Sequence, residues 1–224
     1  MRLTVFGATG GTGREVVRQA VEAGHEVTAV VRDPARLPVR NDLLRVVTAD
    51  VRDDEALRPL VAGADAGLSA LGSPTNKGVG IASAGTRAIL RALQKAGVER
   101  YLAVSAAPVG EQPEEESPLF RVVGTPLVRR VFKAVYADLA LMEEEIRGSG
   151  LKWTLLRPPQ LTDKPGTGEW VLREGTAVPR RHSITRADLA SAMLAMTGDD
   201  ATARKVYGVA NGPRSPRATA RSRP

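Results

Sequence analysis

The chain has 224 residues, of which 42% are hydrophobic and 25% charged, so we expect one globular domain with a full hydrophobic core. It contains no cysteine and only two histidines, which excludes disulfide bonds, zinc–thiolate sites and cysteine nucleophiles, and we expect no metal site. The net charge of +7 falls to +3 (7 − 4) without the four arginines of Asn211 to Pro224, and this argues against a nucleic-acid partner.

The chain opens with a predicted strand–turn–helix–strand unit. An apolar strand from Leu3 to Phe6 runs into the turn Gly7-Ala8-Thr9-Gly10-Gly11-Thr12-Gly13, and a helix then leads to a second strand, Glu26 to Arg32. Such a unit binds a dinucleotide pyrophosphate at its glycine-rich turn and helix N-terminus. Gly7 allows the tight turn, Gly10 the approach of phosphate, and Gly13 the close packing of the helix. Glycines that served packing alone would not need this even spacing.

The end of the second strand indicates which nucleotide binds. An acidic residue in this region normally binds the ribose hydroxyls of NAD, whereas arginine accommodates the 2′-phosphate of NADP. Arg32 falls at the end of the strand and Arg36 follows one helical turn later, so the two guanidinium groups could hold this phosphate together. The alternative is that Asp33 serves NAD and that both arginines are ordinary surface residues. We predict NADP(H) as the cofactor.

Strands and helices continue to alternate along the rest of the chain. This alternation predicts an α/β fold, a doubly wound parallel sheet of the Rossmann type, in a single domain of residues 1–210 with a small substrate-side portion near its C-terminus. Residues 211–224 are expected to form a disordered basic tail. The expected elements are strands at Leu44–Thr48, Ala64–Leu71, Tyr101–Ser105, Lys152–Arg157, Glu169–Arg173 and Val206–Val209, and helices at Glu55–Val61, Ala82–Ala96, about Leu127–Arg147 and Arg186–Thr197.

The sequence also indicates where in the cell the protein is expected. No uninterrupted apolar run reaches about 18 residues, so we expect no membrane partner. A strand beginning at Leu3 leaves no room for a signal peptide, and we expect a cytoplasmic monomer or homodimer.

The acidic run between Pro108 and Pro118 is interpreted as a solvated loop.

Several short segments together resemble a known protein family. They are Phe6-Gly7-Ala8-Thr9-Gly10 with Gly13, Val31-Arg32-Asp33, Gly148 to Lys152, and Arg157-Pro158-Pro159-Gln160 with Gly166-Thr167-Gly168. The spacing G-x-x-G-x-x-G resembles that of extended and atypical short-chain dehydrogenase/reductases. From about Leu3 to Val209 the chain is similar to the atypical members with an NmrA-like NAD(P)-binding domain, and within them to the biliverdin-IXβ reductase/flavin reductase group.

The resemblance implies a role for residues at the carboxyl ends of several strands. Asp50 and Val51 would line the adenine pocket, and Leu71 and Gly72 would pass beneath the nicotinamide ribose. Ser105 would lie beside the nicotinamide, with Pro159 to Leu161 on its other side. The pyrophosphate would be held by Gly7, Thr9, Gly10, Thr12 and Gly13, and the 2′-phosphate by Arg32 and Arg36.

Departures from the family pattern narrow the range of reactions that the chain is expected to catalyse. Dehydrogenases that interconvert alcohols and ketones use a Tyr-x-x-x-Lys pair, but Ala140 stands four residues after Tyr136, and Tyr101 lies within a strand. The missing pair argues against ordinary ketone reduction, and the reductase group named above also lacks it. That group tends to carry histidine where this chain has Gln160. Glutamine can donate a hydrogen bond but cannot deliver a proton, which argues against tetrapyrrole reduction specifically.

We therefore predict an NADPH-dependent oxidoreductase that transfers hydride to a small conjugated acceptor, such as a flavin, quinone, enone or tetrapyrrole-like molecule. Ser105 is expected to donate a hydrogen bond to the acceptor or the carboxamide, or alternatively to satisfy local backbone. Gln160 would orient the acceptor, and solvent would supply the proton. Two alternatives stay open. One is a non-catalytic NADP(H) sensor of the NmrA type, and the other is a dedicated reductase or isomerase of secondary metabolism.

Overall fold

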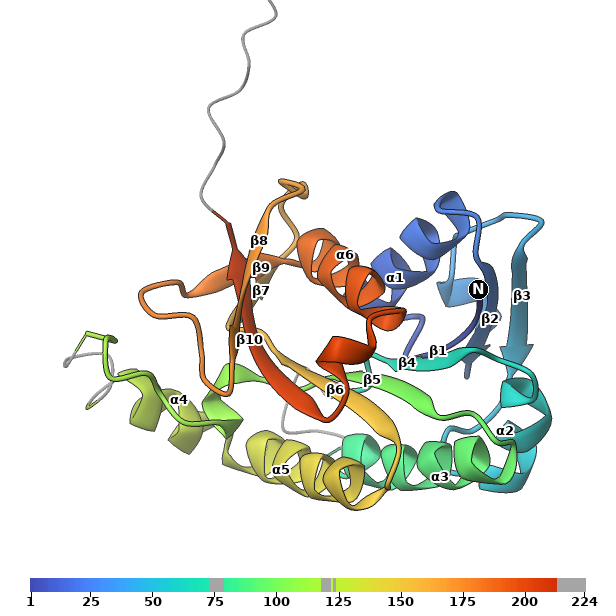
Figure 1. Ribbon diagram of the computed structural model, residues 1–224, viewed down its shortest axis with the longest axis horizontal. Coiled ribbons are helices and arrows are strands. Elements are labelled where there is room, and N and C mark those ends of the chain that lie inside the picture. Colours follow the sequence, from blue (N-terminus) through green and yellow to red (C-terminus); the bar gives the residue numbers. More distant parts are fainter. Residues whose placement is uncertain (73–78, 118–121, 123, 213–224) are drawn as a thin grey trace, which may run out of the picture.

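The computed structural model describes residues 1–72, 79–117, 122 and 124–212, and these form a Rossmann-like α/β domain (Figure 1). The strands are β1 (Arg2–Phe6), β2 (Glu26–Val31), β3 (Leu44–Thr48), β4 (Ala66–Ser69), β5 (Arg100–Val104), β6 (Lys152–Arg157), β7 (Gln160–Thr162), β8 (Trp170–Glu174), β9 (Ser183–Thr185) and β10 (Lys205–Asn211). The helices are α1 (Gly11–Glu22), α2 (Asp54–Val61), α3 (Ile81–Lys95), α4 (Thr125–Val131), α5 (Lys133–Gly148) and α6 (Arg186–Thr197), with 3-10 turns η1 (Pro34–Arg36), η2 (Ala107–Val109) and η4 (Asp200–Thr202).

Eight of the described strands form one sheet in the order β3-β2-β1-β4-β5-β6-β10-β8. Every neighbouring pair is parallel except β10 and β8, which are antiparallel. The chain starts in the middle of the sheet, winds outward through β2 and β3, and then returns to place β4 on the other side of β1. Because the direction of winding reverses between β1 and β4, their carboxyl ends frame the crevice where such folds bind ligands.

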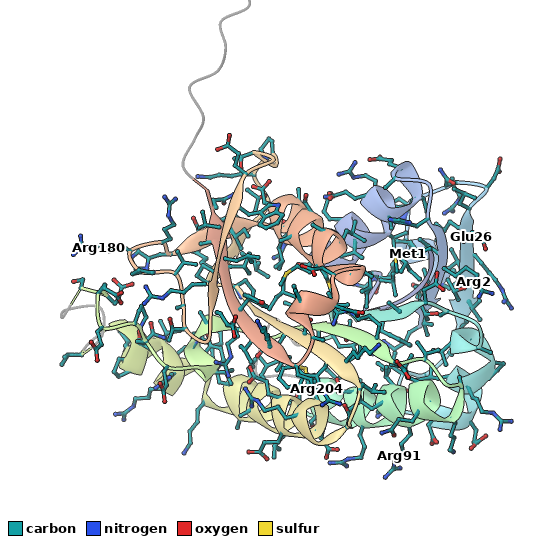
Figure 2. All side chains as sticks on the ribbon, viewed as in Figure 1. Met1, Arg2, Glu26, Arg91, Arg180 and Arg204 are labelled. Carbon is teal, nitrogen blue, oxygen red and sulfur yellow. The ribbon has the colours of Figure 1, made fainter. Side chains whose placement is uncertain are left out.

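Helices cover both faces of this sheet, as expected for a parallel sheet with apolar strands. Figure 1 shows α1 and α6 on one face and α2, α3 and α5 on the other. One hydrophobic core fills the first layer with side chains such as Val16, Val17 and Met193, and a second core fills the other layer with Ile89, Leu93 and Ile146. Charged side chains project outward from these layers, as Arg91 does on α3 (Figure 2). Among the described residues, no helix has both the length and the apolar character to cross a bilayer.

The long helix that we expected at Leu127–Arg147 is two helices. The backbone leaves helical geometry at Phe132, where φ is −108° and ψ is 30°, and this residue separates α4 from α5. Apolar side chains such as Leu139 and Met142 are buried in the second half of this segment, because α5 packs beside α3, while Figure 1 shows α4 extending past the sheet. Phe132 is 38% exposed.

The C-terminal part of the domain differs from the expectation in two respects. The short parallel pair β7 and β9 was not predicted, although it contains Gln160 and Leu161. The last strand also continues past Val209, and Asn211, which we expected to begin the disordered tail, pairs with Trp170 of β8. Its side chain also donates to Asp188, so Asn211 belongs to the folded domain. The rest of the expected tail, residues 213–224, lies outside the described residues.

The acidic loop after β5 is not solvated along its whole length, contrary to our interpretation. Glu116 is only 4% exposed, and its carboxylate accepts hydrogen bonds from the backbone N–H groups of Ser117 (2.8 Å) and Arg180 (3.0 Å). Glu111, Glu114 and Glu115 are exposed. One of the four acids therefore anchors the loop to the segment that precedes β9, a role that the charge pattern does not reveal.

Candidate functional site

The glycine-rich turn joins β1 to α1 at the carboxyl edge of the sheet. Gly7 has a φ of +74°, and a Cβ atom there would lie 2.7 Å from the carbonyl oxygen of Ala70, which follows β4. A Cβ on Gly13 would collide with the carbonyl oxygen of Gly7. The turn is closed by a hydrogen bond from the N–H of Gly10 to that same oxygen (3.0 Å). Gly7 and Gly13 therefore have to be glycine on steric grounds, as the sequence analysis expected.

This turn leaves the N-terminus of α1 open. Gly10 is the N-cap residue and supplies no side-chain cap, and the first turn of α1 contains no acidic residue. The N–H groups of the first helical turn therefore lack a capping side chain, and the helix dipole adds a partial positive charge at this point. Gly10 is exposed and Thr9 is half-buried, whereas Thr12 is 6% exposed. A cradle of backbone donors without side chains fits the diphosphate of a dinucleotide.

The end of β2 carries the two arginines expected to bind the 2′-phosphate. Arg32 and Arg36 are both exposed, and neither side chain has a hydrogen-bond partner among the described residues. Asp33, the acid that could instead serve NAD, accepts a hydrogen bond from the backbone N–H of Ala35 (3.0 Å) and so caps η1. Within the described residues, neither guanidinium group is therefore hydrogen-bonded, whereas one carboxylate oxygen of Asp33 is used inside the turn.

The residues expected around the adenine and the ribose follow β3 and β4, the strands on either side of the pair β2 and β1. Gly85 of α3 brings two of them together, since a Cβ there would lie 3.0 Å from Leu71 and 3.1 Å from Val51. Asp50 is exposed and forms an ion pair with Arg52 at 2.5 Å. Hydrogen bonds from Arg52 lower the pKa of Asp50 to about 2, with a smaller contribution from the charge of Arg32. Gly72 is exposed next to residues 73–78, which lie outside the described part of the chain.

Ser105 follows β5 and is 6% exposed. Its hydroxyl does not satisfy local backbone but donates to Oε1 of Glu143 on α5 (2.6 Å). Arg157 donates to both oxygens of the same carboxylate, at 2.8 and 2.5 Å, and Arg147 lies 2.8 Å from Oε2. Burial alone would raise the pKa of Glu143, but the hydrogen bonds from Arg157 and Ser105 outweigh it and lower this pKa. The carboxylate therefore stays charged and holds the serine proton.

The residues after β6 approach the same edge. Gln160 is exposed, its N–H donates to the carbonyl of His182 (3.1 Å), and its side chain has no hydrogen-bond partner among the described residues. Pro159 and Leu161 are half-buried on either side of it. Gln160 and Ser105 thus both follow neighbouring strands of the sheet, β6 and β5, at their carboxyl ends.

Neither tyrosine discussed above is placed as a proton donor with a lysine partner. Tyr101 lies within β5 with no exposed surface, and burial raises the pKa of its hydroxyl. Tyr136 is half-buried on α5, burial raises its pKa too, and the next turn of the helix presents Ala140 at the position a lysine would need. Within the described part of the chain, the pKa of neither Tyr101 nor Tyr136 is lowered, as acid catalysis of the Tyr–Lys type would require.

Three buried carboxylates support the site, and sequence analysis missed the roles of two. Asp138 of α5 caps α3 by accepting from the N–H groups of Gly80, Ala82 and Ser83 at 2.9 to 3.1 Å. Glu143 holds Ser105 as described above. Asp138 lies four residues before Met142, and Glu143 lies four residues after Leu139, on the apolar side of α5. An acid in such a position is the sequence signal that could have revealed them.

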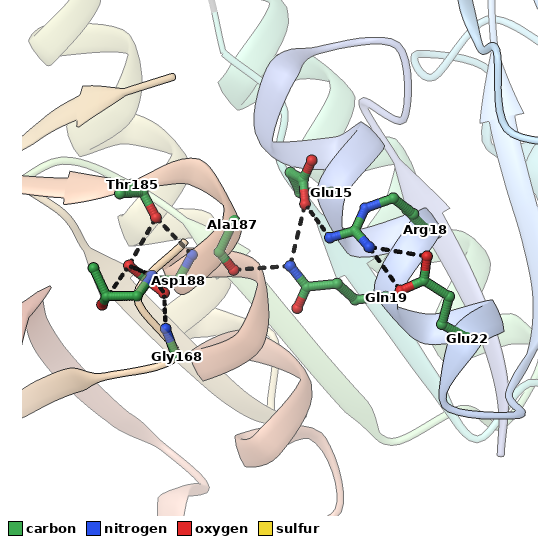
Figure 3. A network of polar contacts seen from close by, with 9 residues as sticks. Glu15, Arg18, Gln19, Glu22, Gly168, Thr185, Ala187 and Asp188 are labelled. Carbon is green, nitrogen blue, oxygen red and sulfur yellow. Dashed lines mark hydrogen bonds and ion pairs between the residues drawn. The ribbon is translucent and has the colours of Figure 1, made fainter. Parts of the chain in front are cut away.

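The third carboxylate, Asp188, joins the start of α6 to the loop before β8 (Figure 3). It accepts hydrogen bonds from the N–H groups of Thr167 and Gly168, both at 2.9 Å, and from the hydroxyl of Thr185 at 2.8 Å. The N–H of Asp188 donates in turn to Oγ1 of Thr185 (3.0 Å), which is the N-cap residue of α6. Burial would raise the pKa of Asp188, but these hydrogen bonds lower it.

The sequence of this chain is similar to those of several known proteins. Residues 7–200 match a family model described as NAD(P)H-binding. A Streptomyces protein named 3-diazoavenalumate denitrifying reductase is 33% identical over 185 residues, which cover 75% of this chain and 58% of that protein. The chain spans 63% and 36% of the lengths of two other curated relatives.

Solved structures share the fold over almost the whole chain. The oxidoreductase ylbE of Lactococcus lactis has a TM-score of 0.80 at 22% identity, covering 96% of this chain and 93% of that one. A short-chain dehydrogenase/reductase of Veillonella parvula, solved in complex with NADP, has a TM-score of 0.79 at 18% identity, covering 95% of both chains. The expected Rossmann-like fold class is therefore confirmed.

Proposed function

Because this chain belongs to the NAD(P)H-binding family, we propose that it is an NADPH-dependent reductase of the atypical short-chain type, which delivers hydride to a conjugated acceptor. The observation that carries the proposal is the combination of an open glycine cradle after β1 with the residues four positions after Tyr101 and Tyr136, neither of which is a lysine. The cradle fits a dinucleotide, and the missing acid restricts the acceptors to those that stabilise added negative charge themselves.

The preference for NADPH rests on the end of β2. Arg32 and Arg36 are exposed without a hydrogen-bond partner among the described residues, so both guanidinium groups can contact a 2′-phosphate. A carboxylate that accepts ribose hydroxyls would favour NAD instead. Asp33 already accepts from the N–H of Ala35, which reduces its capacity for that role. The charge balance at this position favours the phosphorylated nucleotide.

We propose that the buried Ser105 accepts a hydrogen bond in the site, whereas its position in the sequence suggested that it donates one. Bound NADPH supplies a hydride, and the protein has to fix the ring and the acceptor at near-contact distance. The proton of Ser105 is held by Glu143, so its oxygen has lone pairs to accept a hydrogen bond from the carboxamide N–H of the nicotinamide. Ser105 would therefore set the orientation of the ring rather than donate to the acceptor.

Gln160 would hold the acceptor on the exposed side of the site. Its side-chain amide can both donate and accept hydrogen bonds but transfers no proton. Solvent then supplies the proton after hydride transfer, which is sufficient where the charge on the acceptor is delocalised. Flavins, quinones and conjugated enones meet this condition, and a simple ketone does not. The Streptomyces relative carries the word reductase in its name, and this agrees with the proposed class of reaction.

The experiment that tests the proposal follows the loss of the reduced-nicotinamide absorbance band. Purified protein is mixed with NADPH and, in turn, with FMN, a quinone, a conjugated enone and a simple ketone. We expect saturable, protein-dependent oxidation of NADPH with at least one of the first three acceptors and none with the ketone. Tight binding of NADPH without turnover on any acceptor would contradict the reductase and favour a sensor. Turnover with the ketone would contradict the proposed mechanism.

A further inference from the structure

The glycine-rich turn contains a fourth glycine, Gly11, that the dinucleotide motif does not explain. A Cβ atom at Gly11 would lie 2.6 Å from Cδ and 2.7 Å from Nε of Arg186, the first residue of α6. The side chain of Arg186 therefore lies directly across the first residue of α1. The absence of a side chain at Gly11 leaves room for this arginine, which comes from the opposite end of the chain.

The position of Arg186 is fixed by contacts between α1 and α6. The carbonyl of Ala187 accepts a hydrogen bond from Nε2 of Gln19 (2.9 Å), as Figure 3 shows. Thr185 caps α6, and Asp188 ties the same turn to the loop before β8. The start of α6 is therefore held against α1, and the guanidinium of Arg186 stays at the N-terminus of α1.

This arrangement brings several positive charges together. A cation next to a helix N-terminus is unfavourable, because both are positive, and it is stabilised only by an anion. The acid paired with Arg186 is Asp163, whose Oδ1 lies 2.9 Å from Nε and whose side chain is 84% exposed. The terminal nitrogens of Arg186 have no hydrogen-bond partner among the described residues. A groove of about 300 Å³ runs beside them and is lined by Arg14 and Lys164, and also by Glu15, which pairs with Arg18.

We propose that Arg186 is a further cofactor-binding residue whose guanidinium contacts the diphosphate that NADH and NADPH have in common. This inference rests on the proposed function, because it requires a dinucleotide on the glycine cradle. On binding, the terminal nitrogens of Arg186 donate to diphosphate oxygens, and the exposed ion pair with Asp163 is exchanged for this contact. Arg32 and Arg36 then select between the two nucleotides, while Arg186 binds both equally.

The test measures dissociation constants for NADPH and NADH by fluorescence titration. We expect R186Q to weaken both nucleotides by about tenfold, since a charge-assisted hydrogen bond is lost in each case. R186K keeps the charge and is expected to lose less than R186Q. The control is R91Q, which removes an exposed arginine from α3 on the other face of the sheet and is expected to change neither constant by more than about twofold. D163N is expected to strengthen binding, because it removes the competing acid.

Two results would overturn the inference. One is an R186Q protein that melts at a lower temperature but binds both nucleotides as the parent chain does, because Arg186 would then be only a structural ion pair. The other is a loss confined to NADPH, which would place Arg186 at the 2′-phosphate. Failure of the parent chain to bind either nucleotide would instead refute the proposed function itself, so the two failures are distinguishable.

Discussion

Oγ of Ser105 lies 2.6 Å from Oε1 of Glu143, and the two side chains are 6% and 1% exposed. The serine stands at the carboxyl end of β5, where the nicotinamide is expected, and the glutamate comes from the helix behind the sheet. Arg157 of β6 and Arg147 of α5 itself both contact the carboxylate of Glu143. Because the serine proton is directed to Glu143, the serine oxygen keeps lone pairs that can accept a hydrogen bond.

We expect E143Q to lower the free energy of unfolding by about 3 kcal/mol, because it leaves the buried Arg157 without its charged partner. The matched control is E144Q, an exposed acid on the next position of α5, which is expected to change stability by less than about 0.5 kcal/mol. Urea denaturation of the three proteins measures both differences. Equal stabilities of E143Q and the parent chain would show that the buried pair contributes nothing.

The same carboxylate predicts how stability depends on pH. The pKa of Glu143 in the folded state is lower than its ordinary value of 4.5, so its contribution to stability is fully present above pH 4.5 and is lost as the pH falls through the folded-state pKa. Parent and E143Q chains are therefore expected to converge in stability below about pH 4.5. Melting temperatures measured across this acid range check the prediction, and a difference that stays constant with pH would contradict it.

Replacing Arg32 and Arg36 together by alanine should weaken the binding of NADPH much more than the binding of NADH. Each guanidinium is expected to form a charge-assisted contact with the 2′-phosphate, and losing both should raise the dissociation constant for NADPH by about 100-fold. NADH lacks this phosphate and should change by less than about threefold. R45A, which removes an exposed arginine near the amino end of β3, serves as the control. Equal losses for NADPH and NADH would refute the assignment.

Alanine at Gly13 should destabilise the domain, whereas alanine at Gly148 should not. A Cβ on Gly13 meets the backbone of Gly7 and Ala8, which cannot move without opening the turn, so we expect a loss of about 3 kcal/mol and of cofactor binding. A Cβ on Gly148 at the end of α5 meets nothing within 4 Å, and the gain of helix propensity should stabilise by about 0.5–1 kcal/mol. Thermal melting and NADPH titration of both variants test this contrast.

The end of the folded domain can be located by truncation. Deletion of residues 213–224 is expected to leave NADPH affinity and melting temperature unchanged. N211A removes the hydrogen bond that this side chain donates to Asp188 and the one that it accepts from the N–H of Thr185, and should therefore lower the melting temperature by a few degrees. If the deletion also weakens NADPH, the basic segment takes part in binding after all.

Local sequence was sufficient for much of the fold. Strands β3 and β6 and helix α6 begin and end at the predicted residues, because each is a short apolar or amphipathic run bounded by polar, glycine or proline residues. The break at Phe132 was missed because the apolar spacing continues through it. The pair β7 and β9 was missed because three-residue strands carry too few residues for a periodic pattern.

By itself, the sequence determined that this chain binds a dinucleotide in a Rossmann-like fold, since the glycine turn and the flanking strand and helix are contiguous and act through their own backbone. Tertiary structure alone decided which side chains lie next to that turn and next to the end of β5. The contact of Arg186 with Gly11 and that of Glu143 with Ser105 join residues distant in the chain. Such contacts depend on how helices pack across the sheet, and no local pattern of residues encodes them.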